Sequence, residues 1–135
     1  MTMTRRPRVL LVEDDPSVLK MTQLRLEHEG FDVVTAMDGE QALEEAEAQL
    51  PIQLVLLDVK LPKLNGYEVC RTLKHQPRTA HIPVIVFSAS ESQMQKMADR
   101  CIEVGATDWI KKPFRTMDLM SKIRHALGEQ EESNE

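Results

Sequence analysis

Short apolar runs alternate with amphipathic stretches along almost the whole chain. Runs of this length that are rich in Val, Ile and Leu are typical of parallel strands covered on both faces. They predict strands at Arg8–Glu13, Phe31–Thr35, Gln53–Asp58, Pro83–Phe87 and Thr107–Lys111. Because every strand is followed by a helical pattern, the chain is organised as successive βα units.

Between these runs, apolar residues recur with the spacing of amphipathic helices. We expect the first helix to begin near Pro16, with Asp15 as its N-cap, and to end at Gly30. Its inward face would carry Val18, Met21, Leu24 and Arg25. The second helix is expected to begin at Asp38, with Asp38 and Gln41 as a capping box. The other helices are expected to run from about Gly66 to Lys74, to stop at Gly105, and to run from Met117 to Leu127.

The pattern of the last two helices also predicts two buried residues and one helix cap. Ile102 in the fourth helix and Met117 in the fifth fall at inward positions of the pattern, so we expect both to be buried. Thr116 is the expected cap of the fifth helix, because a hydroxyl side chain can accept a hydrogen bond from the first turn.

Five βα units in a row predict the α/β class, with a doubly wound, open parallel sheet, right-handed crossovers and helices on both faces. We expect one domain over residues 1–127. Residues 128–135 contain no hydrophobic side chain and would form a disordered acidic tail.

Composition and charge narrow the class of protein. Of the 135 residues, 41% are hydrophobic and 29% charged, as in ordinary globular domains. The net charge of −5 becomes −1 without the four glutamates of the tail, because 17 basic residues then face 18 acidic ones. We therefore expect no direct contact with nucleic acid. We see no membrane-spanning run and no export signal, so a cytoplasmic location is expected, with Cys70 and Cys101 as reduced core thiols.

Carboxylates stand where the predicted strands end. Glu13 and Asp14 follow the first strand and Asp58 closes the third, while Ser88 and Lys112 follow the fourth and fifth. Ligands of open α/β sheets bind beyond the carboxyl ends of the strands, so these side chains should converge. Two carboxylates about 5 Å apart repel by roughly 3 kcal/mol at an effective dielectric constant near 20. Lys112 supplies one positive charge, and the rest predicts a Mg²⁺ site.

Four segments carry these residues in order: "LLVEDDP", "LVLLDVKLPKLNG", "PVIVFSAS" and "GATDWIKKPF". Together they resemble the receiver domain of two-component response regulators (CheY-like), over about residues 8–127. The resemblance implies a flavodoxin-like sheet of five strands in the order 2-1-3-4-5 with five helices. It also implies a cis Lys112–Pro113 bond.

The resemblance further implies that Asp58 is the nucleophile that takes a phosphoryl group from a phosphohistidine of a sensor histidine kinase or phosphotransfer protein. Asp14 and Asp58 would ligate Mg²⁺, Glu13 would act through a metal-bound water, and the backbone carbonyl of Lys60 would complete the protein ligands. Pro62 and Gly66 would shape the loop that follows Asp58.

Lys112 would pair with the phosphoryl oxygens and Ser88 would donate a hydrogen bond to one of them. Trp109 stands at the switch position and would turn inward when Ser88 moves; the alternative is an ordinary packed aromatic residue. The family more often has Asp, Thr, and Tyr or Phe where this chain has Glu13, Ser88 and Trp109. The surface formed by the fourth helix, fifth strand and fifth helix would then change shape and be read by a downstream protein target.

Lys60 and Ser90 resemble positions that tune phosphate lifetime in the family. Whether the Lys60 side chain reaches the phosphoryl group or stays in solvent is open. Because no further domain follows Leu127, the chain is expected to be a stand-alone, single-domain regulator, either an end-point switch or a phosphorelay shuttle. A homodimer through the last two helices stays open.

Two rival functions belong to other classes. The first is a phosphorylation-independent interaction module with the receiver fold, which the complete set of site residues argues against. The second is a Mg²⁺-dependent phosphatase acting on outside substrates. That reaction needs a general acid near the acceptor, and Lys60 stands two residues after Asp58 where an acid would be required. We therefore expect no enzyme beyond catalysis of its own phosphorylation and dephosphorylation.

Overall fold

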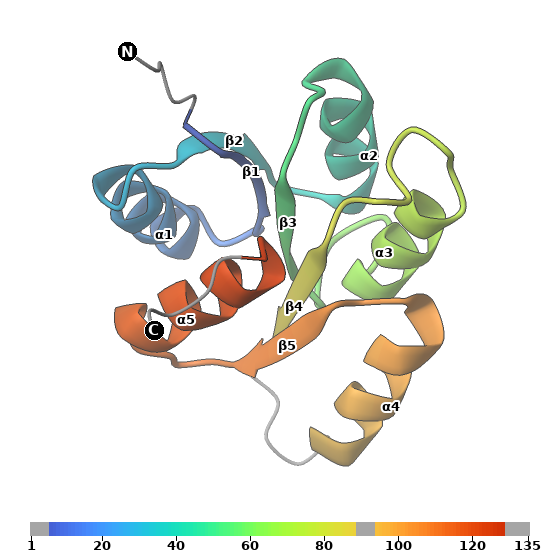
Figure 1. Ribbon diagram of the computed structural model, residues 1–135. Helices are drawn as coiled ribbons and strands as arrows, with labels where there is room; N and C mark the ends of the chain where they lie inside the picture. The colour runs from blue at the N-terminus through green and yellow to red at the C-terminus, as the bar shows by residue number, and fades with distance from the viewer. Residues whose placement is uncertain (1–5, 89–93, 129–135) are drawn as a thin grey trace.

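A five-stranded parallel sheet lies between two layers of helices in the computed structural model, which describes residues 6–88 and 94–128 (Figure 1). The strands are β1 (Arg8–Val12), β2 (Asp32–Ala36), β3 (Leu54–Asp58), β4 (Val84–Ser88) and β5 (Asp108–Lys111). The helices are α1 (Pro16–His28), α2 (Gly39–Ala48), α3 (Gly66–Lys74), α4 (Met94–Val104) and α5 (Thr116–Ala126). The sheet order β2-β1-β3-β4-β5 confirms the predicted fold.

Helices α1 and α5 cover one face of the sheet, and α2, α3 and α4 cover the other (Figure 1). Successive residues of one strand therefore enter two different cores. Val9 and Leu11 of β1 belong to the core under α1 and α5, while Leu10 and Val12 belong to the core under the other three helices. All four are fully buried, which explains why the strands read as continuous apolar runs.

The predicted inward face of α1 is wrong. Met21 and Leu24 are 54% and 52% exposed. The helix instead turns Leu19, Thr22 and Leu26 toward the sheet, at the spacing of three and four residues that a helix face requires. Two apolar stripes lie side by side on this short helix, and the stripe predicted to face the core is the one that faces outward.

Two further residues expected in the core lie on the surface. Ile102 of α4 is 78% exposed and Met117 of α5 is 67% exposed. Among the α4 side chains that the structure describes, Met97, Cys101 and Val104 are buried, at the spacing of one helix face, and Ile102 does not lie on that face. Met117 lies in the first turn of α5.

Of the three residues expected to cap helices, Asp15 and Asp38 do so and Thr116 does not. Asp15 caps α1 by accepting hydrogen bonds from the amides of Ser17 and Val18, and Asp38 caps α2 by accepting one from the amide of Gln41. Thr116 is not a cap, because it is the first residue of α5, and the cap position before it makes no side-chain hydrogen bond.

Three further predictions concern the two cysteines, the C-terminal tail and Ser90. Cys70 and Cys101 are buried free thiols, as predicted. The predicted tail beyond Gly128 and the predicted tuning residue Ser90 lie outside the described residues. Among the described helices, none combines the length and the apolar character needed to cross a membrane.

Candidate functional site

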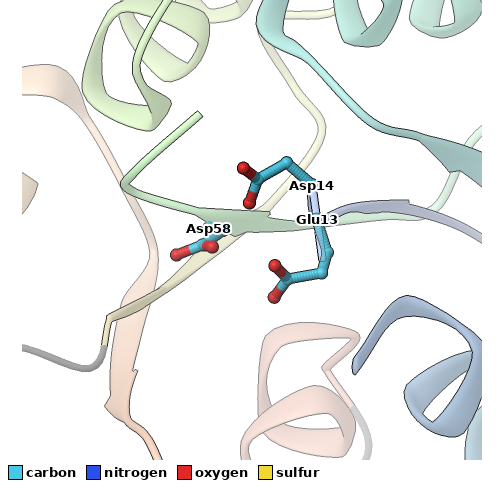
Figure 2. A group of neighbouring side chains, drawn as sticks. All are labelled: Glu13, Asp14 and Asp58. Atoms are coloured by element: carbon cyan, nitrogen blue, oxygen red, sulfur yellow. The ribbon is translucent and has the colours of Figure 1, made fainter. Parts of the chain in front are cut away.

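Three carboxylates meet at the carboxyl edge of the sheet. Glu13 and Asp14 directly follow β1, and Asp58 is the last residue of the neighbouring strand β3, which pairs with β1 in parallel register (Figure 2). One carboxylate oxygen from each residue lies within 4.8 Å of the other two. The structure thus brings together the three acidic residues that the sequence selects as a cluster.

Burial and one ammonium group determine the electrostatics of this cluster. The side chains of Glu13 and Asp58 are 2% and 9% exposed, whereas Asp14 is exposed. Lys112 Nζ lies 2.6 Å from Glu13 Oε1 and 3.4 Å from Asp58 Oδ2. The three carboxylates and Lys112 together still carry two uncompensated negative charges when all are ionised.

The acceptor candidate has a strongly perturbed acidity. Burial raises the pKa of Asp58 from 3.8 to about 6, the neighbouring Lys112 ammonium opposes this rise, and the Glu13 carboxylate adds to it. Asp58 is therefore ionised at neutral pH, but its charge is held at a cost in free energy. Such a cost is reduced by a cation that binds beside the carboxylate.

Lys112 reaches the cluster from the turn after β5. Its backbone amide donates a hydrogen bond of 2.8 Å to the carbonyl of Ser88, and the Lys112–Pro113 peptide bond is cis, as the resemblance implied. Its ammonium also lies 4.8 Å from the ring centroid of Phe87, the strand residue paired with Asp58. The Phe87 ring therefore forms part of the site, which the sequence did not indicate.

The loop after Asp58 is shaped by a glycine. A Cβ atom on Gly66 would lie 2.2 Å from the carbonyl oxygen of Asp58, so only glycine lets α3 begin this close to β3. The Gly66 amide donates a hydrogen bond of 2.8 Å to the Val59 carbonyl. Asn65 and Glu68 form a capping box at the start of α3. The expected role of Gly66 thus has a specific steric reason, a close approach of two backbones.

The two predicted switch residues lie on neighbouring strands. Ser88 closes β4, is 5% exposed and reaches the same edge as Asp58. Trp109 of β5 is half-buried and packs against the core on the α4 side. A pocket of about 310 Å³ lies beside Ser88, and it is lined by Val59, Lys60, Tyr67, Ser88, Lys96, Met97 and Arg100. The Lys60 side chain is exposed at the rim of the site.

The donor set fits a hard divalent cation. Carboxylate oxygens are preferred ligands of Mg²⁺, which is commonly held by one or two of them and keeps several waters. The buried pair of Glu13 and Asp58, the exposed Asp14 and an excess of two negative charges provide such donors with room for water. The same group of residues can therefore hold a metal ion and offer a carboxylate as a phosphoryl acceptor.

Comparison with known proteins places this geometry in a family. The profile of the response regulator receiver domain matches residues 9–124. The alkaline phosphatase synthesis transcriptional regulatory protein PhoP of Bacillus subtilis is 37% identical over 124 residues, which is 92% of this chain and 50% of that protein. The chain spans about half the length of the curated relatives it matches.

Two solved structures have a similar fold. Chemotaxis response regulator CheY4 of Vibrio cholerae superposes with a TM-score of 0.79 at 29% identity, covering 90% of this chain and 99% of that chain. The receiver domain of sensor histidine kinase PA1611 of Pseudomonas aeruginosa, solved with magnesium coordinated in its active site cleft, gives 0.82 at 29% identity and covers 92% and 99%. With its fold, its acidic edge and its profile match in agreement, this chain belongs to the response regulator receiver domain family.

Proposed function

We propose that this receiver domain is a phosphorylation switch in which Asp58 accepts a phosphoryl group from a phosphohistidine of a sensor histidine kinase or phosphotransfer protein. The observation that carries the proposal is the position of Asp58. It is a buried carboxylate at a strand end, within 4.8 Å of two further carboxylates and 3.4 Å from the Lys112 ammonium. Covalent catalysis by a carboxylate requires such a nucleophile beside groups that neutralise phosphoryl charge.

In the transfer, an Asp58 oxygen forms a bond to phosphorus while the bond between phosphorus and the histidine nitrogen breaks, and its electron pair stays on the imidazole. Bound Mg²⁺ would supply neutralisation of the phosphoryl oxygens. Asp14 and Asp58 would hold it directly, Glu13 through a water, and Lys60 through its backbone carbonyl. Lys112 would contact a phosphoryl oxygen, and the Ser88 hydroxyl would donate a hydrogen bond to another.

The output would follow from the two switch residues. A phosphoryl group adds about −1.5 to −2 charges and three acceptor oxygens, so Ser88 would be drawn toward Asp58. Trp109, which packs beside α4, would then move inward and alter the surface of α4, β5 and α5. A downstream protein target would bind one of the two states better, since a switch can shift only by differential binding.

The setting of the domain stays a prediction in three respects. We place it in the cytoplasm, with catalysis limited to its own phosphorylation and dephosphorylation. The stand-alone arrangement is not supported by the relatives, since PhoP is a transcriptional regulatory protein about twice as long as the match. Whether the domain works without further domains, and without contact to nucleic acid, therefore depends on the full-length protein of which it is part.

The decisive experiment is the intact mass of the purified protein after incubation with acetyl phosphate and MgCl₂. We expect a gain of one phosphoryl group, which is lost in Asp58→Asn and in EDTA. The matched control is Asp118→Asn, which removes an exposed carboxylate of α5 and should still be phosphorylated. Absence of the gain in the native chain under all conditions would refute the proposal and favour a phosphorylation-independent interaction module.

A further inference from the structure

The first turn of α2 is in backbone contact with the loop between β3 and α3 (residues 59–65). The Gly39 amide donates a hydrogen bond of 3.2 Å to the Pro62 carbonyl. A Cβ atom on Gly39 would lie 2.3 Å from the carbonyl oxygen and 2.5 Å from the Cβ of Leu64. Contacts that close do not occur, so any side chain at residue 39 would displace Leu64 or α2 itself.

The same loop contains a strained turn that faces α2. Lys63 has φ = 72°, and the Leu64 amide donates a hydrogen bond of 2.8 Å to the Pro62 carbonyl across it. Such a γ-turn with positive φ is rare and costs free energy, so surrounding contacts must hold it. Lys63 Nζ lies 3.6 Å from Asp38 Oδ2 and 3.8 Å from Glu40 Oε1, both in the first turn of α2 or its cap.

Both ends of the loop are fixed to the sheet and to α3. The Val59 amide donates a hydrogen bond of 3.1 Å to the Phe87 carbonyl, and the Gly66 amide donates one of 2.8 Å to the Val59 carbonyl. A displacement of Pro62 or Leu64 must therefore be absorbed mainly by residues 60 and 61. These residues follow Val59, the residue after Asp58, and Lys60 is the one proposed to offer its carbonyl to the metal.

We propose that the first turn of α2 is a positioning element of the metal site, in which Gly39 and Lys63 fix the course of the loop that follows Asp58. Affinity for Mg²⁺ then depends on a contact between two backbones that contains no metal ligand. The inference rests on the proposed function, because it assumes that the loop after Asp58 contributes to metal binding. Groups that orient ligands from outside the metal's own shell commonly affect metal affinity strongly.

The test measures Mg²⁺ affinity of the full chain by titrating MgCl₂ into isotope-labelled protein and following backbone amide shifts, well below the melting temperature. Gly39→Ala should weaken the affinity by about tenfold. The matched control is Gly30→Ala. Gly30 has φ = 100°, so alanine is strained there, but its Cβ would meet no atom within 4 Å and it precedes β2 at the opposite edge of the sheet. This control should lower the melting temperature while leaving Mg²⁺ affinity unchanged.

Lys63→Gln keeps the test valid if Gly39→Ala does not fold. Lys63 is 56% exposed and its ion pairs are weak, so the protein should stay folded and lose about twofold to threefold in Mg²⁺ affinity. Unchanged affinity in the folded loop variants would overturn the positioning role and leave the phosphorylation switch intact. An equal loss in Gly30→Ala would also overturn it, because the effect would then follow general stability. A native chain that does not bind Mg²⁺ would instead refute the metal site itself, and the positioning role with it.

Discussion

Replacing Asp58 with asparagine should stabilise the metal-free protein at neutral pH. The substitution keeps the shape of the side chain and removes a charge that the folded state holds at a cost. Burial, with a contribution from Glu13, raises the pKa of Asp58 from 3.8 to about 6. A residue that is destabilising in the native fold and lies at the centre of a site is typical of a functional group.

The magnitude follows from the size of the pKa change. Each pKa unit corresponds to about 1.4 kcal/mol, so the full penalty at pH 7 is about 3 kcal/mol. This value already includes the attraction of the Lys112 ammonium, 3.4 Å away, which opposes the rise in pKa. Burying the asparagine amide has a cost of its own, so about 3 kcal/mol is an upper limit. We expect a net increase in the free energy of unfolding of about 1–3 kcal/mol, or about 3–4 °C in melting temperature per kcal/mol.

The pH dependence has a definite sign. Below pH 3.8 the Asp58 carboxyl is protonated in both folded and unfolded chains, so the native protein carries no penalty. Between 3.8 and about 6 the folded state binds more protons than the unfolded state, so native stability falls as the pH rises. The advantage of Asp58→Asn should therefore be small near pH 4 and reach its full value above pH 6.

Urea unfolding in EDTA, followed by the fluorescence of Trp109 at several pH values from 4.5 to 7.5, measures this difference. Asp118→Asn is the control, because it removes an equal charge from a carboxylate that is 52% exposed, and it should change stability little. If Asp58→Asn were no more stable than the native chain at pH 7, the charge of Asp58 would not be destabilising. A gain of equal size at pH 4.5 and pH 7 would show that the effect does not come from ionisation of Asp58.

Three further outcomes follow from the same geometry. Added MgCl₂ should raise the melting temperature of the native protein and of Gly30→Ala but not of Asp58→Asn, and an equal rise in all three would contradict a metal site at Asp58. Gly66→Ala should lower the free energy of unfolding by at least about 2 kcal/mol in urea titrations, because its Cβ would lie 2.2 Å from the Asp58 carbonyl oxygen. Lys112→Met should destabilise the protein at pH 7 by about 2–4 kcal/mol, since it leaves two buried carboxylates without their ammonium partner, and unchanged stability would show that the pairing contributes nothing.

The sequence predicts the sheet and the acidic edge because both depend on strong local signals. Continuous apolar runs identify strands that are buried on both faces, and four of the five are closed or followed by a polar residue that an interior would not tolerate unpaired. The edge then follows from topology, because parallel strands end on one side. Asp58 and Asp14 needed no contact information to be placed there.

The helix faces and the contacts between distant segments are not available from such signals. In α1, the stripe through Thr22 and Leu26 contains a polar residue, and the outward stripe through Met21 and Leu24 is also mainly apolar, so the pattern alone does not decide between them. Which stripe of α1 is buried depends on how the helix packs against the sheet, and not on the pattern within the helix. The contact between Gly39 and Leu64 likewise depends on how α2 packs against the loop after β3. A glycine at the start of a helix gives no sign of such a contact in the sequence.

The charge of the site connects its stability with its proposed switching. Three carboxylates and Lys112 sum to −2, and one divalent cation would bring the site to neutrality. An acyl phosphate on Asp58 would carry about two negative charges in place of one, so the metal-bound site would again lack a positive charge. In the structure Lys112 lies 0.8 Å nearer to Glu13 than to Asp58, at 2.6 Å against 3.4 Å. Phosphorylation would reverse that preference, because the new charge lies on the Asp58 side. Movement of Lys112 away from Glu13 would therefore be an electrostatic consequence of the transfer, and it would act directly on the turn that follows β5.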